Sequence, residues 1–366
     1  MEKLLEQLID TSKVYGNNSD MVLVGGGNTS VKDDKVMYVK ASGHALSSID
    51  ESGFVKMDMD AMRGIWNKDY STDTDEREEQ VLSDMMEARC EGETARPSVE
   101  ALLHSLLKDT FVIHMHPALV NGLTCSQQGE EIMRQLFGTR AVWIPLVNPG
   151  YILAKTVKDA IAVHEEEFKV YPDMIFLQNH GVFVSGDSLV RINAIYEEII
   201  DILEKELIRT PDQNLVVIDT KRSEIMGEAV EGKWFEVYNR ELIRFLLDVK
   251  SFNPISSSFT PDHIVYSGFK PLWISESIFS EEDPVADIKK CIAEFTKEHG
   301  APAKIIVVQN TGIFAASENA RDLYLDTVKV AVYTESFGGP LFMDDGQIDF
   351  IRNWEVEKYR AKMSNT

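Results

Sequence analysis

Alternating apolar and polar positions predict two buried strands, each of which leads into histidine. Residues 109–113 are rich in β-branched and aromatic side chains and continue into His114-Met115-His116. Successive side chains of a strand point to opposite faces, so we expect His114 and His116 on one face and Met115 behind them. A second apolar run, residues 174–177, precedes Asn179-His180-Gly181. The glycine there permits a turn that directs His180 back toward the pair.

Elsewhere the pattern predicts a hairpin and a long helix. Two apolar runs flank the polar pair Asp33-Asp34, which is typical of a hairpin turn. A helical period extends over residues 189–207, with four aliphatic side chains on one face: Ile192, Ile195, Ile199 and Leu203. We expect this helix to close a first domain, residues 1–208, followed by a helical connector over residues 209–254.

The remaining segment, residues 255–366, resembles a degenerate second copy of the later half of the first domain. Gln309–Phe314 aligns with Gln178–Phe183, and Thr311 then stands where His180 does. Residues 262–271 can be aligned, with one inserted residue, on the histidine segment 109–117. The histidines are thus missing from this copy, so it cannot bind a metal ion or carry out a reaction that depends on them. We expect a structural or interface role, with a lid or a substrate contact as the alternative.

Three neutral imidazoles from His114, His116 and His180 suit a zinc ion and leave one coordination position open, as in catalytic sites. With eight histidines in the chain, a His-x-His pair is weak evidence by itself. Glu100 strengthens it, because this carboxylate starts a short helix and is followed by Ala101, Leu102 and Leu103. A carboxylate among apolar neighbours suits proton transfer. The alternative is an acid that the helix dipole favours in a first turn.

Composition agrees with a soluble, cytoplasmic enzyme. The 366 residues include 60 acidic and 37 basic ones, a formal net charge of −23. This negative charge argues against nucleic acid or an anionic membrane as a partner. An anionic substrate would have to be attracted by positive groups close to its binding site. The three cysteines are widely spaced, so no disulfide framework or cysteine metal site is expected. The N-terminal segment lacks the apolar region of a signal peptide, and no stretch has transmembrane length.

Five motifs in order over residues 20–190 resemble the class II aldolase/adducin family. They are Gly25-Gly26-Gly27-Asn28-Thr29-Ser30, Lys40-Ala41-Ser42-Gly43, Pro97-Ser98-Val99-Glu100 with His104, the pair His114-Met115-His116, and Asn179-His180-Gly181. Their spacing is most similar to the aldolase half of bacterial rhamnulose-1-phosphate aldolase/dehydrogenase proteins, and the chain also resembles L-fuculose-1-phosphate aldolase. We expect no dehydrogenase half, because no Gly-x-Gly-x-x-Gly fingerprint follows a strand.

This resemblance implies an α/β fold: a three-layer α/β/α sandwich with a central, mainly antiparallel sheet. It also implies one zinc ion per chain and a homo-oligomer in which a neighbouring subunit contributes a tyrosine that is not assigned here. Backbone and side-chain donors would bind a substrate phosphate, and these are Gly27, Asn28, Thr29, Lys40, Ser42, Gly43 and Ser98. Two departures from the family pattern affect this phosphate site, since Lys40-Ala41 replaces Thr-Pro and Val99 replaces a serine.

The resemblance and these residues together imply three possible functions. The first is a zinc-dependent lyase that cleaves a (deoxy)ketose 1-phosphate, such as L-rhamnulose or L-fuculose 1-phosphate, to dihydroxyacetone phosphate and an aldehyde. In it, zinc would stabilise the enediolate and Glu100 would transfer the proton at C3. The second uses the same metal site for epimerisation, dehydration or decarboxylation of another sugar phosphate. The third is an adducin-like binding protein without turnover, which the intact histidines and Glu100 argue against.

Overall fold

The computed structural model describes residues 1–216 and 219–354, and these form two compact units. The first unit comprises residues 1–124 and 128–206 together with Trp354, and the second comprises residues 125–127 and 207–353. The tail of the expected second copy, residues 355–366, lies outside the described residues.

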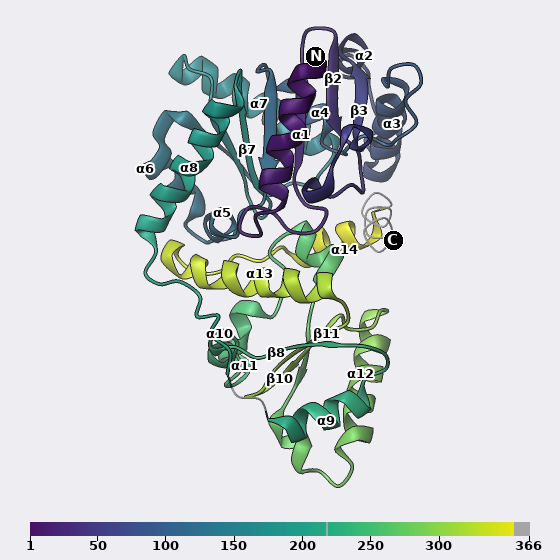
Figure 1. Cartoon of the computed structure of the whole chain (residues 1–366), viewed down its shortest axis with the longest axis vertical. Coiled ribbons are helices and arrows are strands. Elements are labelled where there is room, and N and C mark those ends of the chain that lie inside the picture. The colour runs from purple at the N-terminus through teal and green to yellow at the C-terminus, as the bar shows by residue number, and fades with distance from the viewer. Residues whose placement is uncertain (217–218, 355–366) are drawn as a thin grey trace. The chain divides into compact units, whose positions relative to one another are not determined.

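The first unit is built on a seven-stranded sheet with the order β3-β2-β1-β4-β7-β6-β5. Figure 1 labels β2, β3 and β7 of this sheet and the helices of the same unit. Neighbouring strands are antiparallel except β5 and β6, which are parallel. The elements of this unit are α1 (Glu2–Gly16), β1 (Asn28–Lys32), β2 (Val36–Lys40), β3 (Phe54–Asp58), α2 (Met59–Ile65), α3 (Thr74–Glu87), α4 (Ala101–Leu106), β4 (Phe111–Met115), α5 (Ala118–Thr124), α6 (Gly129–Phe137), β5 (Ala141–Ile144), α7 (Tyr151–Phe168), β6 (Met174–Leu177), β7 (Gly181–Gly186) and α8 (Leu189–Glu206).

Helices cover both faces of this sheet. Val39, Val112 and Phe183 belong to one buried cluster with apolar side chains of α2, α3, α4 and α7. On the opposite face lie α1, α5 and α8, and α8 buries the aliphatic stripe that its 3.6-residue period predicts. The sandwich with a mainly antiparallel sheet is therefore confirmed, as are the hairpin at Asp33-Asp34 and the strand that precedes the histidine pair.

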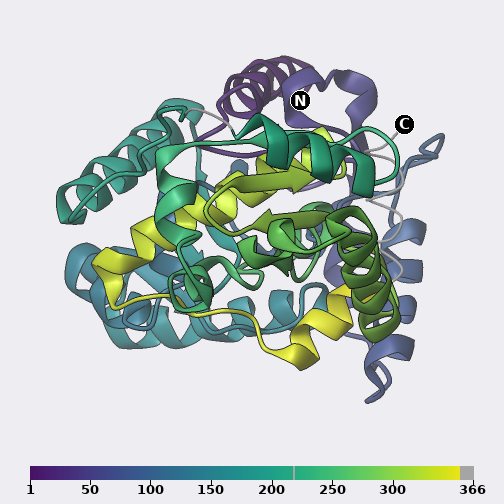
Figure 2. The ribbon, with the colours of Figure 1, turned by 90° about the horizontal axis from the view of Figure 1, so that it is seen from below.

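The second unit contains a four-stranded sheet with the order β8-β11-β10-β9. Figure 2 shows the green strands of this sheet among the helices of the same unit. Its elements are α9 (Thr220–Ala229), β8 (Phe235–Val237), α10 (Arg240–Phe245), α11 (Val249–Phe252), a π-helix (His263–Ser267), β9 (Leu272–Ile274), α12 (Pro284–His299), β10 (Ile305–Val308), β11 (Gly312–Ala315), α13 (Glu318–Thr334) and α14 (Asp345–Asn353). The segment 209–254, expected to be a helical connector, thus supplies a strand to this sheet.

The second sheet repeats one half of the first. β8-β11-β10-β9 has the antiparallel, antiparallel and parallel pairings of β4-β7-β6-β5. His114 pairs with Phe183 in the first sheet, and Glu236 pairs with Phe314 in the second. The predicted alignment of residues 262–271 with the histidine strand is therefore wrong. Residues 263–267 form the π-helix. The counterpart of β4 in the second sheet is β8, because β8 pairs with β11 as β4 pairs with β7.

Candidate metal centre

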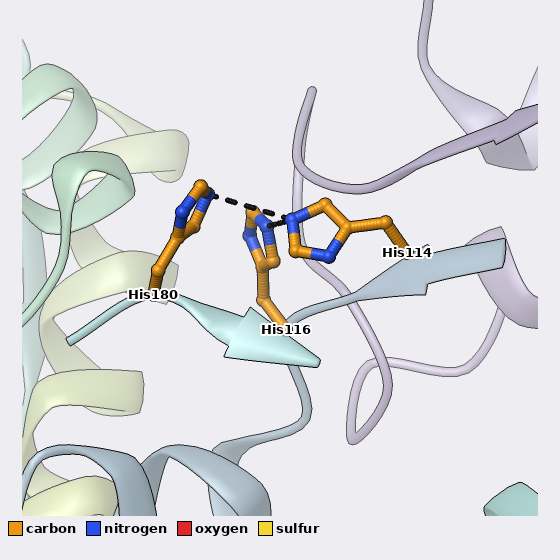
Figure 3. Close-up of side chains that lie close together, drawn as sticks. All are labelled: His114, His116 and His180. Carbon is orange, nitrogen blue, oxygen red and sulfur yellow. Dashed lines mark hydrogen bonds between the residues drawn. The ribbon is translucent and has the colours of Figure 1, made fainter. Parts of the chain in front are cut away.

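Three histidine side chains converge at the end of β4 (Figure 3). His114 lies in β4, His116 follows the strand, and His180 lies in the turn between β6 and β7. The Nε2 atom of His114 is 2.9 Å from Nε2 of His116 and 3.4 Å from Nε2 of His180. Within residues 1–216 and 219–354, no other group of three or more histidine, cysteine or acidic side chains could hold a metal ion.

The protonation of His114 fits a metal ligand. Its Nδ1 atom is 3.1 Å from the carbonyl oxygen of Val182. A carbonyl oxygen only accepts, so Nδ1 carries the proton and the lone pair of Nε2 faces the other two rings. Phe183 stacks on the His114 ring at 3.9 Å and fixes its plane. Nitrogens bound tetrahedrally to one zinc ion lie about 3.3 Å apart, which is close to the observed spacing.

The turn that carries His180 depends on two neighbouring residues. Asn179 has a left-handed backbone with φ of 54°, so the positive φ of this turn lies at the asparagine and not at Gly181. Gly181 is needed for a close approach. A Cβ atom there would lie 2.5 Å from the carbonyl oxygen of Met115 and 2.8 Å from Cδ2 of His116. Only glycine allows β7 to start this close to the histidine strand.

Glu100 lies beside the three histidines. It precedes the first residue of α4 and makes no capping hydrogen bond with its side chain. Its Oε2 atom is 3.6 Å from Nε2 of His114, and its Oε1 atom is 3.8 Å from Nε2 of His180. The side chain is 6% exposed, and Oε1 has no hydrogen-bond partner among the described residues. A buried acceptor without a hydrogen-bond partner, 3.8 Å from one ring of the histidine cluster, fits a site that holds a cation.

A buried polar network supports Glu100, and the sequence did not predict the parts that Asn28 and Ser30 play in it. Asn28 Nδ2 donates to Glu100 Oε2 over 2.6 Å. The ring of His104 bonds through Nε2 to Asn28 Oδ1 and through Nδ1, over 2.7 Å, to the hydroxyl of Ser30. Burial lowers the pKa of His104 well below its usual value, so the ring is neutral. The alternation of side chains along β1 could have placed Asn28 and Ser30 on one face of the sheet. Nothing in the sequence predicts that this face meets Glu100 and His104 at the start of α4.

The residues predicted to bind phosphate are only partly brought together. The backbone of Ser42 donates to the carbonyl of Arg96 over 2.8 Å, and that of Ser98 donates to the carbonyl of Lys40 over 3.0 Å. The Ser98 hydroxyl accepts the backbone N–H of Glu100. These bonds tie residues 40–42 to residues 96–98, the segment that leads directly to Glu100 at the start of α4.

Thr29 lies elsewhere. Its hydroxyl is 2.8 Å from that of Ser12 in α1, on the sheet face opposite Asn28. Gly27 and Gly43 both have positive φ, of 65° and 87°. A Cβ atom at Gly27 would lie 2.9 Å from the carbonyl oxygen of His114, so this glycine lets β1 approach the histidine strand. In the structure, therefore, the glycine-rich segment contributes to assembly of the metal centre.

No helix among the described residues has the length and apolar character required to cross a membrane.

Comparisons with known proteins agree with this fold. The family described as Class II Aldolase and Adducin N-terminal domain matches residues 6–206. The chain is 23% identical over 420 residues to "Uncharacterized oxidoreductase YuxG" of Bacillus subtilis (strain 168). That alignment covers 100% of this chain but only 59% of the length of the relative.

Two solved structures are also similar. One is the N-terminal class II aldolase domain of a conserved protein from Thermoplasma acidophilum, with 28% identity and a TM-score of 0.47, covering 55% of this chain and 92% of that one. The other is an L-fuculose 1-phosphate aldolase, with 21% identity and a TM-score of 0.39, covering 62% of this chain and 96% of that one. Both TM-scores are below 0.5, so the assignment rests on the family match over residues 6–206, more than half of the sequence. The chain belongs to the class II aldolase and adducin family.

Proposed function

We propose that this protein is a zinc-dependent aldolase that cleaves a (deoxy)ketose 1-phosphate, such as L-rhamnulose or L-fuculose 1-phosphate. The products would be dihydroxyacetone phosphate and an aldehyde. The observation that supports this most is the convergence of three imidazoles beside Glu100 Oε1, which has no hydrogen-bond partner among the described residues. Three nitrogen ligands suit zinc and leave room for substrate oxygens.

Cleavage would begin when a base takes the proton of the C4 hydroxyl, a role that the family resemblance gives to a tyrosine of a neighbouring subunit. The C4 oxygen then becomes the aldehyde carbonyl while the C3–C4 bond breaks, and the electron pair of that bond passes to C3 and is delocalised as an enediolate. Over the whole cleavage one proton moves from the C4 hydroxyl to C3. A zinc ion held by His114, His116 and His180 would supply Lewis acidity that stabilises this negative charge. Glu100 would then donate a proton to C3 in cleavage and remove it in condensation. Its Oε1 atom suits this role, because Oε2 is already occupied by the amide of Asn28.

Lys40, Ser42, Gly43 and Ser98 would bind the phosphate. An anionic substrate needs local positive charge on a protein whose formal net charge is −23, and Lys40 supplies one at the end of β2. The backbone bonds between residues 40–42 and 96–98 keep these donors near Glu100. Asn28 and Thr29 would not contribute their side chains, because Asn28 bonds to Glu100 and His104, and Thr29 bonds to Ser12.

A screen of ketose 1-phosphates with the full-length, zinc-loaded protein tests this function. Release of dihydroxyacetone phosphate is followed by its reduction with glycerol-3-phosphate dehydrogenase and NADH. Cleavage should disappear in the double variant His114→Ala/His116→Ala and after chelation, and return when zinc is added to the wild type. If the products show inversion, loss of water or loss of carbon dioxide without dihydroxyacetone phosphate, the same site performs epimerisation, dehydration or decarboxylation instead.

A further inference from the structure

A hydrogen-bonded chain runs from β1 through α4 to Glu100. It consists of Ser30, His104, Asn28 and Glu100, which are 0%, 0%, 6% and 6% exposed. Consecutive members are linked by hydrogen bonds: Ser30 to His104, His104 to Asn28, and Asn28 to Glu100. The chain is thus shielded from water, and each member has to satisfy its polar atoms through its neighbours.

The chemistry of the end groups fixes the direction of every bond. The carboxylate of Glu100 only accepts, so the Asn28 atom that faces it is the NH₂ group, and the amide oxygen faces His104. That oxygen also only accepts, so the proton of the neutral His104 ring lies on Nε2. Nδ1 is then without a proton and accepts from the hydroxyl of Ser30. All donors therefore point along the chain toward Glu100, and bonds aligned in this way strengthen one another.

We propose that His104 is a positioning residue, which holds the Asn28 amide in one orientation and through it the Glu100 carboxylate. This inference rests on the proposed role of Glu100 in proton transfer. The ring nitrogens of His104 contact Asn28 and Ser30, so its influence on Glu100 passes through Asn28. With Oε2 held by Asn28, the oxygen that remains for the substrate proton is Oε1, which is 3.8 Å from His180.

The protonated nitrogen of His104 can be identified without substrate or metal. Long-range ¹⁵N–¹H correlation spectra of the full-length, metal-free protein, labelled with ¹⁵N-histidine, distinguish the two neutral tautomers from the imidazolium. His104→Gln removes one ring signal and so assigns it. We expect proton occupancy at Nε2 alone between about pH 6 and pH 8, because burial keeps the ring neutral. A proton on Nδ1 alone would overturn the proposal, because Nε2 would then not donate to the amide oxygen of Asn28. Protons on both nitrogens would overturn it as well, because the ring would then be an imidazolium and could not accept from Ser30.

Three variants then test the consequence for turnover. His104→Leu removes the donor to Asn28, whereas His104→Gln retains an N–H group that reaches the same oxygen. His164→Leu is the matched control, because His164 is also a buried histidine of the first unit and bonds to the carbonyl of Thr139 instead. Loss of a residue that orients an active-site ligand typically costs about 10- to 100-fold in activity. We expect a loss of this size in kcat for His104→Leu, with KM and zinc content within about twofold of wild type.

His104→Gln should recover most of the lost kcat, and His164→Leu should leave kcat unchanged. An equal loss of kcat in His104→Leu and His164→Leu would reject the proposal. So would a loss of kcat in His104→Leu that is matched by an equal loss of bound zinc. If His104→Leu is insoluble, the tautomer of the wild type still decides. An Nε2 proton in a protein that cleaves no ketose 1-phosphate would reject the proposed function but leave the chain of hydrogen bonds intact.

Discussion

Asn179 and Asn310 adopt the same left-handed backbone conformation, with φ of 54° and 52°, in equivalent turns of the two units. A glycine follows each of them two residues later, and a Cβ atom added to that glycine would collide with the neighbouring strand. For Gly181 the nearest atom is the Met115 carbonyl oxygen, and for Gly312 it is that of Val237, both at 2.5 Å. The backbone of the metal-binding turn is therefore retained in the second unit.

The side chains that project from this retained backbone differ. Glu236, Tyr238 and Thr311 take the positions of His114, His116 and His180. The hydroxyl of Tyr238 donates to Glu236 over 2.5 Å. Arg222 donates to the hydroxyl of Thr311 over 3.0 Å and to Glu276 over 3.1 Å, which brings a fixed cation to the turn. We infer that the second unit kept the packing of the repeat and replaced the metal ligands with hydrogen bonds and ion pairs.

Metal analysis should find about one divalent ion per chain, held by the first unit. Inductively coupled plasma mass spectrometry of the purified protein measures this ratio. The double variant His114→Ala/His116→Ala should contain none, because a single imidazole does not hold zinc. Glu236→Ala/Thr311→Ala is the matched control in the second unit and should keep the full content. A ratio near two, or metal retained without His114 and His116, would contradict the assignment.

Glu100→Gln should keep zinc and substrate affinity but lose most turnover. Glutamine preserves the shape and can still bond to Asn28 after its amide rotates, but it cannot exchange the C3 proton. A positioned general base contributes about 10²- to 10⁴-fold, so a loss in kcat below about tenfold would mean that Glu100 is structural. Exchange of the C3 proton of dihydroxyacetone phosphate with deuterium oxide, followed by NMR, isolates this step from aldehyde binding.

Gly181→Ala should weaken metal binding. The added methyl group would lie 2.5 Å from the Met115 carbonyl and 2.8 Å from the His116 ring, so the turn or the ring has to move. We expect zinc affinity to fall by about 10- to 100-fold, as when groups that orient metal ligands are lost. Competition with a fluorescent chelator measures the affinity. Gly64→Ala in α2 is the control, because no atom beyond its chain neighbours and its own helix backbone lies within 4 Å of the added Cβ. Unchanged affinity in Gly181→Ala would show that the strands tolerate a wider separation.

Lys32→Met should stabilise the protein more at low pH than at high pH. The Lys32 ammonium group has no hydrogen-bond partner among the described residues. Burial lowers its pKa from 10.5 to about 7, although Asp109 and Asp187 oppose the shift. Between these two values the unfolded chain binds more protons than the folded one, so this group makes stability rise with pH. Below about pH 7 the folded protein must bury the charge.

Urea unfolding at about pH 6.5 and about pH 9.5 measures this difference. The gain in free energy of unfolding for Lys32→Met should be larger at the lower pH and should shrink at the higher one. Lys35→Met changes an exposed lysine in the hairpin turn and is the control, with no comparable pH dependence. A gain for Lys32→Met that is the same at both pH values would show that Lys32 is not titrating in this window.

The sequence alone determined the local elements of this protein and the identity of the converging histidines. Alternation along β4 and the apolar run of β6 depend on neighbouring residues only, so the strands and the approach of His114, His116 and His180 could be predicted. The helical stripe of α8 could be predicted for the same reason. The position of Glu100 at the start of a short helix with apolar neighbours also marked it as a candidate, and the structure places its carboxylate within 3.8 Å of the rings of His114 and His180.

Only the tertiary structure decided which side chains surround Glu100 and which strand is the counterpart of β4. Thr29 and Asn28 are adjacent in sequence, yet one faces Ser12 and the other Glu100, because β1 lies between helices on both faces. β8 has only three residues and no histidine, so its sequence does not reveal that it is equivalent to β4. The equivalence is seen in its pairing with β11, which matches the pairing of β4 with β7. A residue's face on a strand follows from local geometry, but strand order, register and the covering helix are set by packing of the whole sheet.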